Sequence, residues 1–251
     1  MKTESPISRR MYFTLVILLA ALSALNVFLP PGEFAAGTAD QELPASQPVL
    51  ALVNALISLL FYGGLGYLGL RLALQLRLPE LWDDQVSVRG RLLVPSLAGM
   101  VIGVIIIVVD VIFSQFRSVG FLPHPPFPTS LAASASAAIG EEIIFRLFFI
   151  AFWVWLIASV LLKNRWQDGI FWIIAVVSAI VFAVAHIPSV MLLYGVSEMQ
   201  ALPSGMLVEL LLLNGFVSLA AAYYFKKVGF LGPVLLHFWV DIVWHVLWGA
   251  I

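Results

Sequence analysis

Long apolar stretches alternate with short polar segments along the whole chain. A membrane-spanning helix needs about 20 predominantly apolar residues, and seven runs of roughly that length are present. They cover residues 11–30, 49–70, 92–113, 131–162, 170–187, 205–225 and 229–250. The pattern predicts an all-α, polytopic transmembrane helical bundle. We leave open whether the stretch 188–203 dips back into the membrane as an eighth element.

The composition supports a membrane protein and excludes several other classes. Hydrophobic residues make up 62% of the 251 residues and charged residues 11%, whereas soluble domains carry about 25% charged residues. The net charge of −1 provides no basic surface for nucleic acid. Because the chain has no cysteine, disulfides, cysteine metal sites and cysteine nucleophiles are excluded. We expect one membrane domain, 1–251, embedded in the lipid bilayer without a nucleic-acid partner.

The first apolar run follows three basic residues and is longer than the 7–15 apolar residues of a signal-peptide core. We therefore expect it to remain as an uncleaved first helix. The alternative is a signal peptide removed near "GTADQ" at 37–41.

The basic residues predict the orientation, because cytoplasmic loops carry an excess of Lys and Arg. With a cytoplasmic N-terminus and seven spans, eleven of the thirteen basic residues fall on the cytoplasmic side. Arg117 then lies outside and Arg146 within a span, while the outside loop 31–48 is acidic. The acidic residues of that loop are Glu33, Asp40 and Glu42. We predict a multi-pass protein of the cell membrane with its N-terminus in the cytoplasm.

Three charged residues interrupt the apolar run 131–162. One charge at the centre of a bilayer costs about 2.5–3.5 kcal/mol on insertion scales, so their presence calls for an explanation. Glu142 and Arg146 are four residues apart and can form an ion pair on one helix face. Glu141 is rotated by about 100° from Glu142 and stays available for another role. A buried charge cluster that only joins helices would explain the pair but leave Glu141 without a partner.

The histidines form a second pattern. His237, Asp241 and His245 follow one another at intervals of four residues, which predicts a polar stripe facing protein or water rather than lipid. His186 ends an apolar run just before Pro188. His124 lies in a proline-rich loop, and we assign no role to it.

Three short motifs occur in order on separate predicted spans. "EEIIFR" (141–146) fits E-E-x-x-x-R, "FAVAH" (182–186) fits F-x-x-x-H, and "HFWVD" (237–241) fits H-x-x-x-(N/D). With these motifs the sequence resembles the CAAX-protease and bacteriocin-processing (CPBP) family of intramembrane proteases, which includes the Ras-converting type II CAAX endopeptidases. The likeness covers 131–250, expected to be the catalytic core, whereas 1–130 is only generically hydrophobic.

The resemblance implies a helical membrane protease whose motifs meet in a cavity. It would hydrolyse a peptide bond in a membrane-associated or lipid-anchored protein or peptide. The resemblance assigns activation of water to Glu141 and His186, and stabilisation of the oxyanion to His237 and Asp241. Glu142 and Arg146 would support these residues, and we add His245 from the same polar stripe.

Asp241 departs from family members that have asparagine at the last motif position. An aspartate donates a hydrogen bond only when it is protonated, and burial can hold a carboxylic acid neutral at pH 7. If Asp241 is ionised instead, it would either orient His237 or serve as a metal ligand. The other ligands of that metal would be His237, Glu141 and His186. Two histidines with two carboxylates suit zinc, and the family has been described both as metalloproteases and as metal-independent glutamate proteases. The sequence has no compact zinc-protease motif, so we expect no required cofactor.

Two other functions compete with the protease. An ion- or proton-coupled transporter would use Asp110, Glu141 and His237 as a relay, but the inverted repeats typical of transporters are not detected. A non-catalytic, immunity-type membrane protein would keep the motifs only for packing. If the chain is a protease, then prenylated C-termini, leader peptides and sorting tails all suit such a cavity. The predicted topology places Glu141 and His186 in the outer half of the membrane, which favours exported or membrane-anchored substrates.

Overall fold

The computed structural model describes residues 4–32, 44–116 and 122–251. Several features singled out above lie outside these ranges: Lys2, Glu33, the segment 37–41, Asp40, Glu42 and Arg117.

Within the described ranges, seven helical segments are long and apolar enough to cross a membrane. This confirms the predicted all-α, polytopic bundle. The stretch 188–203 adds no further span, because it consists of the end of the fifth segment and a short 3₁₀ turn. The segments are Pro6–Asn26, Gln47–Gln75, Arg89–Ser114, Thr129–Leu161, Gln167–Leu193, Ser204–Val228 and Leu231–Ala250.

Several spans combine α-helical and π-helical stretches. The first three spans are α1 (Pro6–Asn26), then α2 (Gln47–Ile57), η2 (Ser58–Tyr62) and α3 (Gly63–Gln75), then η3 (Arg89–Leu93) and α4 (Val94–Ser114). The fourth and fifth are α5 (Thr129–Glu142), η4 (Ile143–Ile150), α6 (Ala151–Val154) and η5 (Trp155–Leu161), then α7 (Gln167–Ala185) and α8 (Ile187–Leu193). After the turn η6 (Met199–Ala201) come α9 (Ser204–Val228), α10 (Leu231–Asp241), η7 (Ile242–Leu247) and η8 (Trp248–Ala250).

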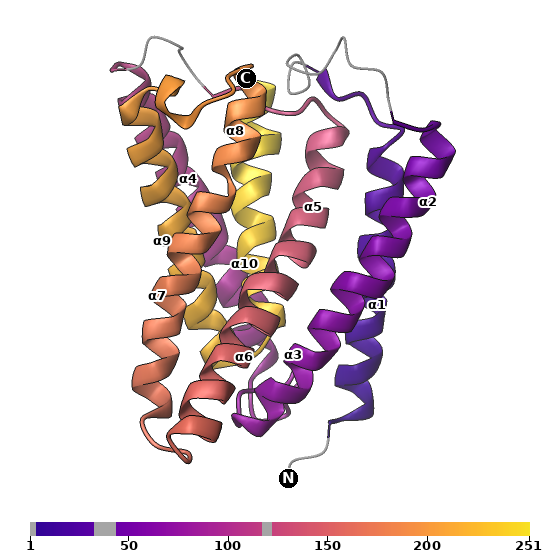
Figure 1. Cartoon of the computed structure of the whole chain (residues 1–251), viewed down its shortest axis with the longest axis vertical. Helices are drawn as coiled ribbons and strands as arrows, with labels where there is room; N and C mark the ends of the chain where they lie inside the picture. The colour runs from indigo at the N-terminus through magenta and orange to yellow at the C-terminus, as the bar shows by residue number, and fades with distance from the viewer. Residues whose placement is uncertain (1–3, 33–43, 117–121) are drawn as a thin grey trace.

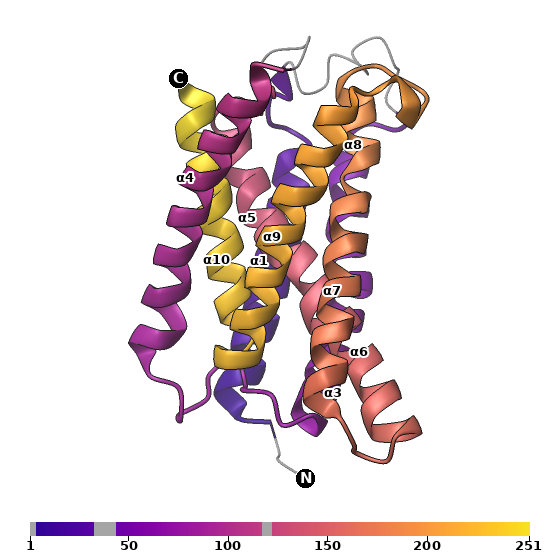
Figure 2. The ribbon, with the colours of Figure 1, turned by 90° about the vertical axis from the view of Figure 1, so that its left-hand side faces the viewer.

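The helices stand side by side, with the N-terminus at one end of the bundle and the C-terminus at the other (Figure 1). Helix α10 is central, because it packs against α4, α5 and α9. Helix α7 packs along α9, and α1 packs against α2 and α5 (Figure 2). The motif-bearing helices α5, α7 and α10 therefore lie within one bundle, with α9 beside two of them.

Two glycines allow α4 to approach α10 closely. Gly99 and Gly103 are four residues apart on α4, a spacing of small residues that brings membrane helices into contact. A Cβ atom on Gly99 would lie 2.2 Å from the carbonyl oxygen of Leu236, so any larger residue would displace α10. Leu236 precedes His237 in the chain, and this contact therefore helps to set the position of the third motif.

Candidate active site

The three motifs meet at one cavity of about 310 Å³. Glu141 near the end of α5, His186 between α7 and α8, and His237 with Asp241 on α10 all line it. Most of the remaining wall is apolar and comes from α4, α8 and α9. The side chains that sequence analysis assigned to catalysis thus come together in space, although up to 100 residues separate them in the chain.

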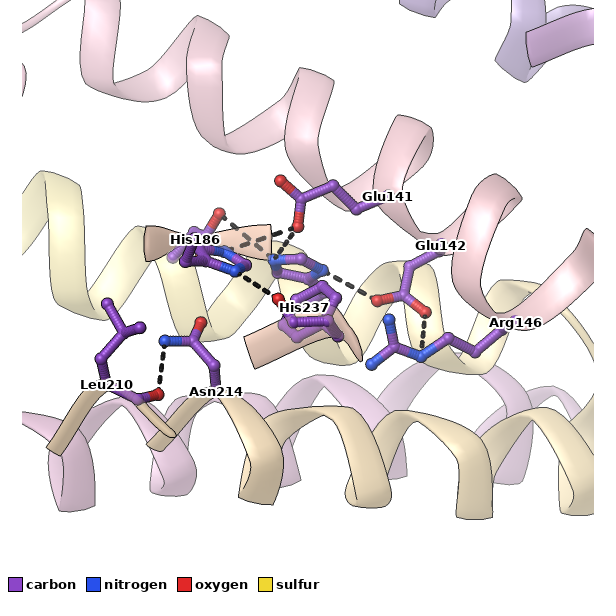
Figure 3. A network of polar contacts seen from close by, with 9 residues as sticks. Glu141, Glu142, Arg146, His186, Leu210, Asn214 and His237 are labelled. Atoms are coloured by element: carbon purple, nitrogen blue, oxygen red, sulfur yellow. Dashed lines mark hydrogen bonds and ion pairs between the residues drawn. The ribbon is translucent and has the colours of Figure 1, made fainter. Parts of the chain in front are cut away.

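Glu141 lies between His186 and His237. Its Oε2 atom is 3.9 Å from Nε2 of His186 and 3.9 Å from Nε2 of His237 (Figure 3). These distances exceed those of direct hydrogen bonds, and one water molecule can bridge groups at such a separation. The side chain of Glu141 is 35% exposed and lines the cavity, while its Oε2 atom is buried and makes no hydrogen bond within the described residues.

His186 is positioned by a break in its helix. α7 ends at Ala185 and α8 begins at Ile187 with Pro188 in its first turn, where proline is tolerated because it lacks the backbone N–H. The Nδ1 atom of His186 lies 2.8 Å from the carbonyl oxygen of Phe182. Because a carbonyl only accepts hydrogen bonds, Nδ1 carries the proton. In the neutral ring, Nε2 is then a free acceptor that faces Glu141.

Glu142 connects Arg146 with His237. Its Oε2 atom is 3.1 Å from Nε of Arg146, the ion pair expected from the four-residue spacing. Its Oε1 atom accepts a hydrogen bond of 2.8 Å from Nδ1 of His237, which sequence analysis did not predict. Both members of the ion pair are fully buried and His237 is 5% exposed. Glu142 therefore also orients the His237 ring and turns its Nε2 atom toward Glu141.

Phe182 packs among all three motifs and explains why a phenylalanine begins F-x-x-x-H. The guanidinium of Arg146 lies 4.6 Å from the centre of its ring, a cation–π distance. The same ring contacts His237 edge-to-face with centroids 5.9 Å apart. Its carbonyl holds His186, as described above. Phe182 thus supports both histidines and the buried cation without carrying any reactive group.

Asp241 lies beside the same Nε2 atom of His237 that faces Glu141. Its Oδ2 atom is 3.7 Å from Nε2 of His237, and the residue is 9% exposed. Sequence analysis placed His245 on the same stripe, but the helix is π-helical from Ile242 onward. His245 lines the same cavity, yet its hydrogen bond goes elsewhere.

That hydrogen bond joins His245 to His124, for which sequence analysis found no role. The two Nδ1 atoms are 3.1 Å apart, so one ring donates and the other accepts. His124 also packs edge-to-face on Trp244, with centroids 4.7 Å apart. Burial lowers the pKa of His124 below its ordinary value, and the nearby charge of Asp110 opposes this shift. The pair fastens the loop 122–128 to the end of the last span.

Sequence analysis missed two further polar residues of the cavity wall, Glu209 and Asn214 on α9. Both interrupt the apolar run 205–225, the same signal that singled out Glu141, so they could have been found. The Nδ2 atom of Asn214 donates to the carbonyl oxygen of Leu210 at 2.9 Å (Figure 3). Its amide group therefore has a defined orientation beside the histidines.

Glu141 also borders a second, smaller cavity of about 210 Å³. This serine-lined cavity lies on the other side of α5, toward α1 and η2. Besides Glu141, its lining residues that carry a hydroxyl group are Ser23, Ser58, Tyr62 and Ser136.

The positions of these residues can be compared with the arrangement that a zinc ion would need. In the ranges 4–32, 44–116 and 122–251, no three His, Asp or Glu side chains are grouped so that they could hold a metal ion. Glu141, His186, His237 and Asp241 are neighbours, but they do not form a ready set of ligands. The chemistry considered below therefore uses only the side chains themselves.

A comparison with known families decides the relationship. The family model of the "Type II CAAX prenyl endopeptidase Rce1-like" proteins matches residues 123–243. Over this region the chain is similar to the Rce1-like proteins. The matched region is just under half of the chain and contains all three motifs, which confirms the resemblance found in the sequence. No curated protein and no solved structure shows a significant match. This match supports the general class of CAAX-type intramembrane endopeptidases for the chain. The seven membrane-spanning segments within the described ranges indicate a multi-pass membrane protein.

Proposed function

We propose that this chain is an intramembrane endopeptidase that hydrolyses a peptide bond in a membrane-associated or lipid-anchored polypeptide. Glu141 and His186 activate the attacking water. The observation that carries the proposal is the position of the Glu141 carboxylate, 3.9 Å from the Nε2 atoms of both histidines at the wall of a largely apolar cavity. A water molecule there can donate its protons to Glu141 and His186 and direct a lone pair at the substrate.

The reaction follows from these positions. The water oxygen forms a bond to the carbonyl carbon of the substrate, and Glu141 accepts the proton that water releases. That proton is then transferred to the nitrogen of the leaving amine as the C–N bond breaks. The products are a free carboxyl group and a free amine, so atoms and protons balance without a further reactant.

His237 and Asp241 stabilise the negative charge that develops on the carbonyl oxygen. Donors aimed at such an oxyanion contribute about 2.7–4 kcal/mol each. His237 can donate from Nε2 when both of its nitrogens carry protons, and the Glu142 carboxylate at 2.8 Å from Nδ1 balances the charge of that ring. Asp241 can donate only as the neutral acid, and its burial favours that form.

Residues 131–250 act as the catalytic core in this proposal, and helices from 1–130 complete it. Ile106 of α4 contributes to the cavity wall, and α4 packs along α10.

The transporter and the immunity-type protein remain the competing functions. The test is substrate trapping. The Glu141→Gln variant should retain an uncleaved polypeptide that the wild-type protein converts to two fragments, which neither competing function predicts.

Replacing Asp241 by asparagine separates two roles for this residue. If Asp241 donates as a neutral acid, the amide of asparagine supplies an equivalent N–H, and we expect kcat to stay within about tenfold of the wild-type value. Asp241→Ala, which has no donor, should lose about 10²–10³ in kcat. The measurement is the cleavage rate of both variants in lipid.

The opposite result would reassign Asp241. If Asp241→Asn is as damaging as Glu141→Gln, the ionised form is required, either to orient His237 or as a metal ligand. Treatment with a chelator distinguishes these roles, because a metal enzyme would lose activity and regain it when zinc is added.

A further inference from the structure

We propose that the active-site cavity faces the extracytoplasmic half of the membrane. Its substrates are then membrane-anchored polypeptides whose scissile bond lies at the outer end of the anchor, rather than prenylated proteins of the cytosol. The assignment of substrates rests on the protease activity proposed above. The assignment of the face does not.

The first observation is the distribution of charge between the two ends of the bundle. In the described part of the chain, every Lys and Arg except Arg146 lies at the end where the N-terminus is located (Figure 1). The opposite end, with the loops 27–32, 44–46, 122–128 and 194–203, has neither Lys nor Arg in its described residues. Cytoplasmic ends of spans carry the excess of basic residues, so the N-terminal end is cytoplasmic. The basic residues at that end are Arg9, Arg10, Arg71, Arg77, Arg89, Arg91, Lys163, Arg165, Lys226 and Lys227.

The second observation is the depth of the site. Glu141 is 12 residues from the outer end of its span at Thr129 and 20 residues from the inner end at Leu161. With a rise of 1.5 Å per residue, Glu141 lies about 18 Å along the helix from its outer end. His186 is 7 residues from the outer end of its own span at Leu193. Both catalytic groups are therefore nearer to the extracytoplasmic end.

The third observation is that the lining of the cavity reaches the outer end of the bundle and not the inner end. Leu122 and Pro123 of the outer loop line it together with Leu193 of α8. None of its described lining residues comes from the inner segments 76–88 and 162–166. On the inner side of Glu141, the helix continues with the buried Glu142–Arg146 pair and a tightly packed core. The core residues on this helix are Leu147, Ile150, Ala151 and Val154, each at most 1% exposed.

These observations together define how a substrate reaches the site. A polypeptide can approach Glu141 from the outer leaflet or the extracytoplasmic space, whereas packed side chains separate Glu141 from the cytoplasm. The apolar wall formed by Leu210, Leu213 and Val217 suits the apolar residues that flank a membrane anchor. Substrates of this class are anchored polypeptides cleaved after they have crossed or entered the membrane.

The absence of cysteine makes the face directly measurable with single-cysteine variants of the full chain. Ser189→Cys lies in the cavity wall and Ser197→Cys in the outer loop, while Gln85→Cys is the matched exposed position on the inner side. In intact cells, a membrane-impermeant maleimide should label Ser189→Cys and Ser197→Cys, and it should label Gln85→Cys only after permeabilisation. Labelling of Gln85→Cys in intact cells would overturn the assigned face, whatever the activity of the protein.

The substrate class is tested separately by mapping new chain termini in membranes that contain wild-type protein or Glu141→Gln. Termini that depend on Glu141 should lie on the extracytoplasmic side of their anchors. Termini on the cytoplasmic side, or cleavage of a farnesylated CAAX peptide presented from the cytoplasm, would overturn the substrate class. If no termini depend on Glu141, the proposed protease itself fails, and the substrate class with it, while the maleimide result still decides the face.

We also infer that the serine-lined cavity holds the water consumed by the reaction, an inference that likewise rests on the proposed hydrolysis. Hydrolysis in a membrane needs water at the base, and Glu141 borders this cavity as well as the larger one. A water site needs room and two to four polar partners. The cavity of about 210 Å³ meets both requirements through Ser23, Ser58, Tyr62 and Ser136.

Local contacts keep these hydroxyl groups in place. The Oγ atom of Ser58 lies 3.0 Å from Oγ of Ser23 and 2.9 Å from the carbonyl oxygen of Asn54. Ser136 accepts a hydrogen bond of 3.1 Å from Nδ2 of Asn26, at the outer end of α1. The hydroxyl groups thus come from α1, η2 and α5, which would give the N-terminal helices a part in the reaction.

Threonine and valine have nearly the same shape and differ by one hydroxyl group, so they provide a matched test. The Ser23→Thr/Ser58→Thr variant should cleave at a rate near that of the wild type. The Ser23→Val/Ser58→Val variant should lose about tenfold in kcat with an unchanged KM, the effect of one weakened hydrogen bond to water. Thermal unfolding of both variants controls for folding. Equal kcat values in the two variants would overturn the assignment, and so would a loss confined to KM.

Discussion

Replacing Glu141 by glutamine should abolish cleavage and leave the bundle folded. Glutamine keeps the size of the side chain but cannot accept the proton of the attacking water, and loss of a general base costs about 10²–10⁴ in rate. The Oε2 atom of Glu141 has no direct hydrogen-bond partner among the described residues, so the exchange breaks no bond of that atom. Cleavage rate and thermal unfolding, measured on the same purified variant in lipid, check both parts of this expectation.

Two further variants control the result. His186→Ala removes the other group assigned to water and should be similarly severe. Ser189→Ala changes the same cavity wall without touching the proposed machinery and should keep most of the activity. If Glu141→Gln retains full proteolysis of the natural substrate, the assignment of the base is wrong.

Replacing Arg146 by alanine should reduce the yield of folded protein far more than replacing Glu141 by alanine. Arg146 and Glu142 are fully buried and lie 3.1 Å apart, and removing one partner of a buried ion pair costs about 3–5 kcal/mol. Glu141 is partly exposed to the cavity, so its truncation leaves no buried charge without a partner. Detergent-solubilised yield and unfolding temperature of the two variants provide the comparison.

The matched double variant Glu142→Gln/Arg146→Met tests whether the yield of folded protein depends on the balance of the two buried charges or on the shapes of the two side chains. It removes both charges, so folded yield should recover relative to Arg146→Ala. Activity should not recover, because glutamine can accept the hydrogen bond from Nδ1 of His237 but has no negative charge to balance a protonated ring. Equal yields for Arg146→Ala and Glu141→Ala would contradict the division into a structural and a catalytic glutamate.

The sequence by itself determined the features that depend on neighbouring residues. Hydropathy over about 20 residues predicted the seven spans, because each helix satisfies its own backbone hydrogen bonds in the membrane. The four-residue spacing predicted the contact between Glu142 and Arg146, since residues i and i+4 share a helix face. The three motifs, each a short stretch of the chain, also indicated the resemblance to this family before any tertiary contact was known.

Only the tertiary structure decided which groups of different helices meet. The hydrogen bond from His237 to Glu142 joins residues 95 positions apart, and nothing in helical periodicity specifies such a pair. The same applies to His124 and His245. A stripe counted in steps of four placed His245 with Asp241, and both line the cavity. The hydrogen-bond partner of His245, however, is His124 of the loop 122–128. Helix periodicity determines the face on which a side chain lies, whereas the packing of the helices against one another determines what that face contacts.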